Sequence, residues 1–575
     1  MIYRGTIQKM EQMTVYRKSI SIEDRDYKEW VVNYEDGDPD EIRIIDPINM
    51  KLFNGDVFYF EGENLNLENS VTRQRSLCGV LVLGQNKTFG KWKNRPLFKC
   101  IPFDKNLPMF LIPYEQKNNF SKNYKNKYVV FRFDNWESKH PIGKLLNSFG
   151  DVDNLNAFYQ YQLNCRDLNI SYRKFMDATR GLGKQKKNSS ILGLLEKYDV
   201  VDLEDEEVFT IDPEDCLDFD DAVSIRKDKK AKYVLRIYIS NVSIWLDYLK
   251  LWGVFSDRVS TIYFPDKNYP MLPTILSNGL CSLVENETRV AFVCELHIQK
   301  LKIEEIKFFN AKIRVRKNYV YEDAKLVTST NYLRVYNLVK NLNEEDGTNY
   351  LPFIYDSHDV VAYLMVMMNH LCASDMSSKR NGIYRSIVMK GENMEVVPEK
   401  IRTFMSLLRN STGGKYVRYN ADIGHAILNL KEYVQITSPI RRLVDLLNMI
   451  CFQDNYGLVK WVDEGKESFY QGWLERLDYI NEKMKQIKKA QNDCNALHLC
   501  YTNMDIIDSF HDGYIIEKEE RESIFHYMVY LNDLKMIIKM KNILDLPVYS
   551  SHKFKIFVFC DENTLKQKVR VQLFD

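Results

Sequence analysis

The pattern of the sequence changes twice along its length, and this change constrains the fold more than any other feature. Up to about residue 170, apolar runs such as DVFYFEGE, SLCGVLVLG and KYVVFRF alternate with Gly, Asn, Asp and Pro, as in small β-barrels. The pattern is mixed from about residue 201 to 330, where AKYVLRIYIS alternates as a strand does. Helical patterns dominate from about residue 355, and the last stretch returns to strands. The order predicts β-barrels on both sides of a mixed α/β domain.

Several segments allow more specific predictions. VVAYLMVMMNHLCASDM is apolar on nearly all sides and predicts a buried helix. An apolar stripe at steps of three and four predicts one long amphipathic packing helix near residues 465–500, with Leu474, Leu477, Ile480, Met484, Ile487, Ala490, Cys494 and Leu497 on one face. Strands near the C-terminus alternate basic with apolar residues, as a five-stranded barrel with one basic face would. RGLGKQKKNSS, at 180–190, indicates a linker, or alternatively a phosphate contact.

Length, charge and cysteine usage exclude several protein classes. A chain of 575 residues exceeds one ordinary core, so several domains are expected. The net charge is +1, so a nucleic-acid binder would need a local positive surface such as an internal groove. The 11 cysteines include no CxxC pair, which argues for reduced thiols and against a zinc or disulfide framework. The N-terminus has no apolar core of a secretory signal, and no apolar run is long enough for a membrane span.

The segment TIDPEDCLDFDD, at 210–221, concentrates negative charge. Asp212 falls at a strand-to-loop corner because Pro213 breaks the strand. Asp218, Asp220 and Asp221 lie close together where the chain leaves the loop and enters the next apolar segment. Carboxylates this close disfavour joint ionisation unless a divalent cation such as Mg²⁺ or Mn²⁺ neutralises them. The frame of a calcium EF-hand is absent. The alternatives are a solvated acidic turn or a two-metal site of the kind that cleaves phosphodiesters.

A second segment, ITSPIRRLVDLL at 436–447, supplies cations. Ser438 followed by Pro439 predicts a helix start, which places Arg441 and Arg442 in the first turn. Helix N-termini favour anions, and Arg can bind phosphate bidentately. The alternative for either Arg is an ordinary ion pair with a carboxylate.

These residues resemble a known family. TIDPEDCLDFDDAVSI is similar to the first hallmark of the RNB (ribonuclease II) family of exoribonucleases, and YVQITSPIRRLVDLL is similar to the second. TIYFPDKNYPMLPTILSNGLCSL resembles the family motif between them. FKCIPFDKNLPMFLIP and FRFDNW resemble the cold-shock barrels of the eukaryotic exosome catalytic subunit. The resemblance runs from about residue 50 to the end, and no amino-terminal PIN endonuclease domain is expected.

The resemblance implies the domain plan. A first cold-shock-type OB barrel is expected at 1–85, and a second with a linker at 86–200. The mixed α/β RNB catalytic domain is expected at 201–508 and a C-terminal OB barrel at 509–575. OB faces suit single-stranded RNA, because aromatic side chains stack on bases and cations follow the backbone.

It also implies site residues. Asp212, Asp218, Asp220 and Asp221 match the four metal-binding positions, with Asp220 the most critical. The implied catalytic residues are Asp220, Arg441 at the scissile phosphate, and Tyr321, which orients the terminal nucleotides. Tyr263 matches an aromatic that stacks on the 3′-terminal base. The implied RNA-binding set is Tyr263, Tyr321, Ser438, Arg441 and Arg442, whereas His425 matches a family His without an assigned role.

Some positions depart from the family pattern. Ala362 and Tyr363 stand where acidic residues are usual, although Asp359 lies one helical turn upstream. Tyr238 and Asn241 replace a usual His and Asp, and Val434 and Gln435 replace Thr-His. The lost carboxylates leave open a catalytically weakened relative.

Together the motifs and the resemblance predict an Mg²⁺-dependent 3′→5′ exoribonuclease that uses two ions and degrades single-stranded RNA to nucleoside 5′-monophosphates. The alternative is a catalytically weakened RNA-binding scaffold, and a DNA-directed nuclease fits less well. An exosome-like complex is a candidate partner and no membrane association is expected. The expected location is the cytoplasm, with a nuclear or viral setting also open.

Overall fold

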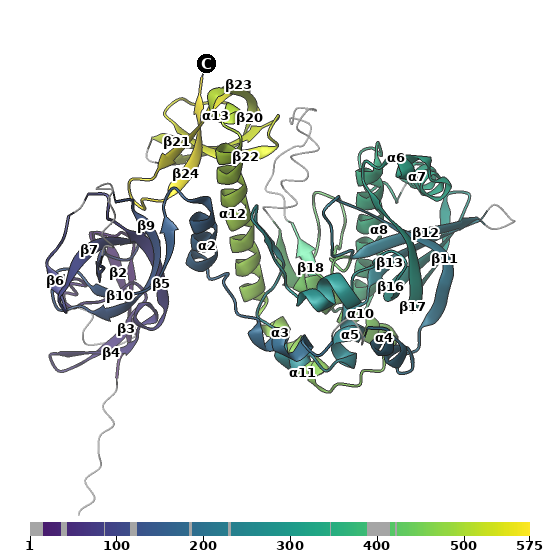
Figure 1. The fold of residues 1–575 in the computed structure, drawn as a ribbon, viewed down its shortest axis with the longest axis horizontal. Helices are drawn as coiled ribbons and strands as arrows, with labels where there is room; N and C mark the ends of the chain where they lie inside the picture. Colours follow the sequence, from purple (N-terminus) through teal and green to yellow (C-terminus); the bar gives the residue numbers. More distant parts are fainter. Residues whose placement is uncertain are drawn as a thin grey trace, which may run out of the picture. The chain divides into compact units, whose positions relative to one another are not determined.

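The computed structural model describes residues 15–35, 43–85, 87–115, 124–182, 187–227, 232–345, 347–387, 414–419, 422–521 and 523–574. The chain divides into two compact units, one formed by Met1–Asn169 with Asn492–Asp575 and the other by Ile170–Gln491. Figure 1 shows strand-rich ends and a central region that combines strands with helices, which confirms the multidomain OB and α/β fold class.

The N-terminal part of the first unit holds two antiparallel-rich sheets. The smaller has the order β2-β1-β3-β4, with β1 at Lys18–Ile22, β2 at Trp30–Tyr34, β3 at Val57–Glu61 and β4 at Asn64–Asn69. The larger has the order β5-β9-β10-β8-β7-β6, with β5 at Ser76–Leu81, β6 at Lys91–Trp92, β7 at Arg95–Pro102, β8 at Phe110–Pro113, β9 at Lys127–Asn135 and β10 at Ile142–Asp151. Buried side chains of both sheets, including Phe58 and Phe131, form one core.

The expected boundary at residues 85 and 86 is misplaced. Strand β5 lies before residue 86, yet it pairs along its whole length with β9 and partly with β7. The second sheet therefore begins at Ser76. The sequence hid this because the small helix α1, Val71–Gln74, joins β4 to β5 without a Gly- or Pro-rich linker.

The C-terminal strands of the same unit form a five-stranded sheet. Its order is β22-β21-β20-β23-β24, with β20 at Phe510–Arg521, β21 at Ile524–Leu531, β22 at Met536–Asn542, β23 at Ser551–Cys560 and β24 at Gln567–Leu573. In β22, Ile538 and Met540 are buried while Lys539 and Lys541 are exposed. This is the expected alternation of a core face with a basic face.

The second unit is built on a closed barrel, at the right of Figure 1. Its strands are β11 at Val201–Asp212, β12 at Asp221–Lys227, β13 at Tyr233–Ser240, β16 at Thr288–Gln299 and β17 at Lys302–Val320. Neighbours are antiparallel except β11 and β17, which run parallel with Asp212 opposite Val320. Both β11 and β17 therefore end at the edge where the acidic segment begins.

One α-helix lies in the sequence between barrel strands β13 and β16, and others follow β17. They are α5 at Val242–Tyr248, α6 at Ala324–Thr328, α7 at Thr330–Leu342, α8 at Ser357–Ser378, α10 at Leu443–Tyr456, α11 at Gly465–Glu475 and α12 at Leu477–Thr502. Helix α8 is the predicted apolar helix, and Val360, Met367 and Cys372 are fully buried. Among the described residues, no helix has the length and apolar character that crossing a membrane requires.

Two expectations about helices are wrong. The single helix near residues 465–500 is two helices, because Arg476 ends α11 outside the helical region and its guanidinium pairs with Asp257 at 2.6 Å. The expected linker at 180–190 becomes helical at Lys187, where α4, Lys187–Leu195, begins. Residues 183–186 of that segment lie outside the described residues.

Candidate active site

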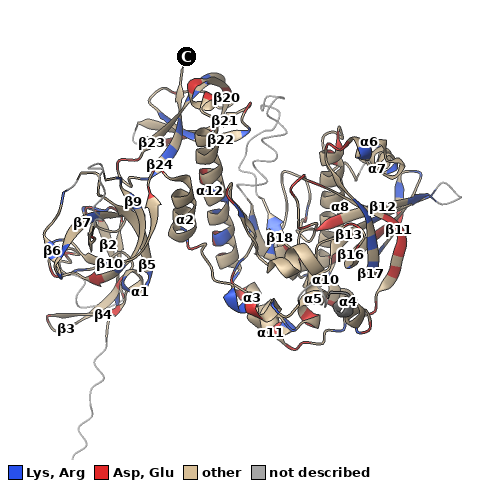
Figure 2. Ribbon diagram, in the orientation of Figure 1, with Lys and Arg blue, Asp and Glu red and all other residues tan. Residues whose placement is uncertain are grey.

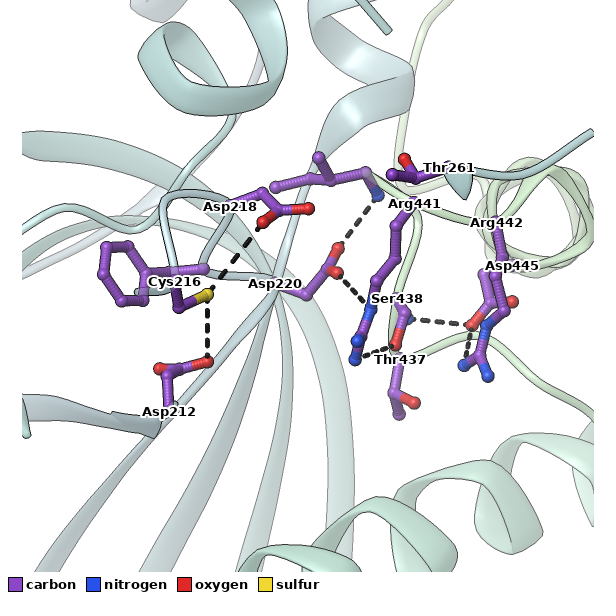
Figure 3. Close-up of polar contacts among 12 residues, drawn as sticks. Asp212, Cys216, Asp218, Asp220, Thr261, Thr437, Ser438, Arg441, Arg442 and Asp445 are labelled. Atoms are coloured by element: carbon purple, nitrogen blue, oxygen red, sulfur yellow. Dashed lines mark hydrogen bonds and ion pairs between the residues drawn. The ribbon is translucent and has the colours of Figure 1, made fainter. Parts of the chain in front are cut away.

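The acidic segment connects two barrel strands. Strand β11 ends at Asp212, a loop follows, and β12 begins at Asp221. Ser282 fixes this loop, because its Oγ accepts a hydrogen bond from Phe219 N at 3.0 Å and donates one to Leu217 O at 2.9 Å. The loop brings Asp218 and Asp220 back toward the strand ends (Figure 3), with Asp220 only 2% exposed.

Burial raises the pKa of all four carboxyl groups of the acidic segment. Burial, together with the charge of Asp221, raises the pKa of Asp212 to about 7. Burial raises the pKa of Asp221 to about 6, although Arg441 and Arg442 oppose the shift. Burial likewise raises the pKa of Asp218 and, most strongly, that of Asp220. A site that stays ionised at neutral pH therefore needs additional positive charge.

The second hallmark forms a turn before a helix, which corrects the predicted helix start at Ser438. Arg442 N donates to Ser438 O at 3.0 Å, and α10 begins only at Leu443. Arg442 is extended, with φ −135° and ψ 126°, because its backbone bridges to Ser260 on another segment. Arg441 therefore precedes the helix instead of lying in its first turn.

The turn contacts the acidic loop directly (Figure 3). Ile440 N donates to Asp220 Oδ1 at 2.9 Å, and Arg441 Nε lies 3.1 Å from Asp220 Oδ2. Ser438 Oγ accepts from Arg441 Nη2 at 3.2 Å and so orients the guanidinium. The side chain of Arg441 is 45% exposed, so part of it remains accessible to a ligand.

Arg442 is engaged elsewhere. Its Nη2 lies 2.8 Å from Asp445 Oδ1, and the same oxygen accepts a hydrogen bond from Ser438 N at 2.8 Å. Asp445 is fully buried. The structure thus gives Arg442 the ordinary ion pair that was the alternative to phosphate binding, and it gives Ser438 a positioning contact with Arg441.

Tyr263 and Tyr321 both reach the acidic corner. Tyr263 is the last residue of β14, Ile262–Tyr263, and its hydroxyl donates to Asp218 Oδ2 at 3.3 Å. Tyr321 directly follows β17, and its N donates to Asp212 O at 3.2 Å. The Tyr321 ring stacks on His358 of α8, with ring centroids 3.8 Å apart and an interplanar angle of 10°. Sequence reasoning missed His358, because nothing in the spacing links β17 to α8.

The positions that depart from the family pattern have structural roles. Tyr238 is fully buried and its hydroxyl bonds Ser224 Oγ at 2.8 Å. Asn241 caps α5 and donates to Asn310 at 2.8 Å. Tyr363 is fully buried, whereas Ala362 on the same helix is exposed. Only Ala362 therefore leaves room for a carboxylate to reach solvent.

His425 is a buried structural residue. It is 2% exposed, and its Nδ1 accepts a hydrogen bond from Leu428 N at 3.3 Å. Burial and the nearby charge of Arg385 lower its pKa to about 4. The imidazole is consequently neutral at physiological pH, as expected for a satisfied core histidine.

The donor set of the corner fits a hard divalent cation. In the part of the chain that the structure describes, no three His, Cys, Asp or Glu side chains are gathered closely enough to hold a metal ion as they stand. Asp212 Oδ2 is nevertheless buried without a hydrogen-bond partner among the described residues, and burial raises the pKa of Asp212 and Asp220, with the charges of neighbouring carboxyl groups adding to the shift. Carboxylate oxygens in this state suit Mg²⁺ or Mn²⁺.

Family models match two regions of the chain. Residues 200–344 match the model of the RNB domain, a range that contains the acidic segment, Tyr263 and Tyr321. Residues 97–160 match the Dis3-like cold-shock domain 2. The second match covers β8, β9, β10 and most of β7 in the larger N-terminal sheet.

Curated relatives cover part of the chain. A ribonuclease R of Vibrio parahaemolyticus is 27% identical over 441 residues, which is 62% of this chain and 51% of that protein. A probable exosome complex exonuclease of Caenorhabditis elegans is 26% identical over 259 residues, or 44% of this chain and 25% of that protein. The chain spans about half the length of the bacterial relative.

Solved structures show the same fold. Mycoplasma genitalium RNase R, in complex with ribose methylated single-stranded RNA, has a TM-score of 0.66 at 15% identity, covering 97% of this chain and 100% of that one. Yeast Ssd1, a pseudonuclease, has a TM-score of 0.60 at 15% identity, covering 94% of this chain and 80% of that one. The same fold is therefore found in a nuclease and in a pseudonuclease.

Proposed function

We propose that the chain, whose residues 200–344 match the RNB domain, is a 3′→5′ exoribonuclease of that family and hydrolyses single-stranded RNA. One observation carries the proposal: Asp220 accepts from Ile440 N and faces Arg441, at 2.9 and 3.1 Å, so that the acidic loop and the basic turn form one centre. A cluster of carboxyl groups beside a partly exposed arginine suits metal-assisted cleavage of a phosphodiester.

Different residues of the site have different proposed roles. Asp212, Asp218, Asp220 and Asp221 would hold two Mg²⁺ ions. When bound, such ions activate water and stabilise the leaving oxygen. Arg441, oriented by Ser438, binds the scissile phosphate and stabilises its developing charge. Tyr263 and Tyr321 position the last nucleotides by stacking, which accepts any base. Nucleoside 5′-monophosphates would leave stepwise.

The relatives favour RNA over other substrates. The Mycoplasma genitalium RNase R structure is a complex with single-stranded RNA, and the Caenorhabditis elegans relative is a probable exosome complex exonuclease. We extend these two properties to this chain as proposals: single-stranded RNA as the substrate and an exosome-like assembly as a partner. The cytoplasm is proposed as the location from the sequence alone.

A second candidate function is an RNA-binding scaffold without turnover. It is favoured by Ala362 and Tyr363, which stand where the family usually has carboxylates, and Tyr363 is fully buried. The intact set of four Asp residues favours the enzyme instead.

Incubation of the full chain with 3′- or 5′-labelled single-stranded RNA and Mg²⁺ separates the two. The enzyme shortens RNA to mononucleotides or very short oligomers and leaves single-stranded DNA intact, whereas the scaffold binds RNA without shortening it. Asp220→Asn should abolish shortening and keep RNA bound. Asp215→Asn is the matched control, because Asp215 belongs to the same segment but is exposed and outside the family pattern. Unchanged degradation by Asp220→Asn would contradict the site assignment.

A further inference from the structure

Lys488 presents an uncompensated positive charge inside the second unit. Its Nζ is buried and has no hydrogen-bond partner among the described residues. Buried ammonium groups normally have a carboxylate or several acceptors, because desolvating an unpaired charge costs folding stability. Binding of an anion would compensate the buried, unpaired charge of Lys488.

The surroundings of Lys488 are themselves basic. Burial and the charge of Arg385 lower its pKa to about 8, and Arg385 also lowers the pKa of His425. Arg385 belongs to β18, Ile383–Ser386, and its guanidinium lies over the ring of Tyr416, 4.9 Å from the centroid. Figure 2 shows basic residues on β18 and along α12. Arg385 is thus close enough to influence the charge of Lys488, and no carboxylate among the described residues bonds Lys488 Nζ.

Helix α12 connects this basic cluster to the catalytic centre. Asn481 exchanges two hydrogen bonds with the backbone of Tyr416 on β19, Lys415–Arg418, at 2.8 and 2.9 Å. Lys488 lies seven residues further along α12, and therefore on the same face of the helix as Asn481. Gln491 lies less than one turn beyond Lys488, and its side chain accepts from Tyr263 N at 3.5 Å. Lys488 is thus placed between the β18–β19 hairpin and the residue that is expected to stack on the terminal base.

We propose that Lys488 binds a backbone phosphate of the RNA upstream of the scissile bond. The inference rests on the proposed function and adds a contact to it. The flexible stem of lysine lets the ammonium turn toward an entering phosphate. The contact is to the backbone, so it acts equally on all sequences. It would hold the strand in register while Tyr263 and Arg441 engage its end.

The contact predicts opposite effects on binding and stability. Lys488→Met removes the charge and keeps the length of the side chain. We expect RNA affinity to fall roughly fivefold to tenfold at low salt, and the slope of log affinity against log salt to become shallower by about 0.7. The melting temperature without RNA should stay the same or rise, because an unpaired buried charge is lost. A lysine with a purely structural role would lower the melting temperature instead.

The experiment measures binding of labelled single-stranded RNA to the full chain in an Asp220→Asn background, so that RNA is not consumed. Lys488→Met is compared with Lys488→Arg, which keeps the charge and should bind within about twofold of the parent. Lys485→Met, an exposed lysine three residues earlier on α12, is the matched control for a loss of one charge. Lys488→Gln replaces the Met variant if that variant does not fold.

Competition with a nucleoside 5′-monophosphate and with inorganic phosphate separates the two sources of phosphate. A weaker affinity and shallower salt slope for RNA, specific to Lys488, support the proposal. It is overturned if Lys488→Met binds RNA as Lys485→Met does, or if it loses only the binding of the free anions. A parent chain that fails to bind RNA overturns both this inference and the proposed function, whereas normal binding with an unaffected Lys488 variant overturns this inference alone.

Discussion

Arg441 Nε lies 3.1 Å from Asp220 Oδ2, although the two residues are far apart in the sequence. Asp220 is 2% exposed and its other oxygen is held by Ile440 N, so Arg441 is the cation that its side chain faces. The guanidinium is part exposed and the carboxyl is not. The pair therefore leaves Arg441 accessible to a phosphate while it fixes the loop that carries the acidic residues.

Replacement of Arg441 should affect catalysis and stability separately. Arg441→Met should slow RNA shortening by about 10²–10³-fold, because a preorganised donor to the developing charge is lost. It should also lower the free energy of unfolding by about 1–3 kcal/mol, because Asp220 stays buried without its partner. Adding Asp220→Asn should recover stability but not activity. Single-turnover assays and urea unfolding test this, and a wild-type rate for Arg441→Met would refute the assigned role.

The stabilisation by divalent ions should depend on pH. The pKa values of Asp212, about 7, and Asp221, about 6, lie above those of the same groups in an unfolded chain. At pH values between the unfolded-state and folded-state pKa, the folded state therefore binds more protons than the unfolded state. Without metal, their contribution to stability falls as pH rises from about 4 to about 7. Mn²⁺ binds the deprotonated groups. The increase in the melting temperature of the protein that added Mn²⁺ causes should therefore be larger at about pH 8 than at about pH 5.5. Equal shifts at both pH values, or none, would count against the ligand assignment.

The stack of Tyr321 on His358 should influence substrate binding. With ring centroids 3.8 Å apart, His358 supports one face of Tyr321, the residue expected to orient the terminal nucleotides. His358→Ala should raise KM about twofold to tenfold, the value of an aromatic pair, with a smaller effect on kcat. His358→Phe keeps the stack and is the control. A normal KM for the alanine variant would show that Tyr321 needs no support from α8.

The burial of His425 should make the free energy of unfolding decrease as the pH becomes acidic. Its pKa of about 4 lies below that of an exposed histidine, so the unfolded chain binds more protons as pH falls from about 7. Stability is then lost, by about 2 kcal/mol between pH 7.5 and pH 5. His425→Asn keeps an acceptor for Leu428 N but does not titrate, so its unfolding free energy should change less over this range. Parallel pH profiles for both proteins would contradict this.

The sequence predicted what local patterns and motifs determine. Strand alternation gave β13 and β22, and the acidic segment placed Asp212 at the end of β11. Contacts between segments that are distant in the sequence could not be predicted from it. Ser438-Pro439 is a good helix start locally, but the bridge between Arg442 and Ser260 keeps the backbone extended. The ion pair of Arg442 with Asp445 and the stack on His358 likewise depend on tertiary packing, which no spacing encodes.

A carboxylate restored on α8 would distinguish a weakened enzyme from a scaffold. Ala362 is exposed and lies one turn beyond His358 on α8, so a Glu there faces the same side as the stack on Tyr321. If lost carboxylates limit turnover, Ala362→Glu should increase the rate of RNA shortening about threefold to tenfold, the range for one new contact to the terminal nucleotide.

Tyr363→Glu is the matched test of the second position. Tyr363 is fully buried beside Tyr350, with ring centroids 5.4 Å apart, so a carboxylate there would be desolvated without a cation. This variant should lose roughly 3–5 kcal/mol of stability and gain no activity. Rates are measured with labelled RNA and stability by urea unfolding. If Ala362→Glu leaves the rate unchanged while Asp220→Asn abolishes it, the enzyme functions without a carboxylate at position 362, and Ala362 is not a sign of lost function.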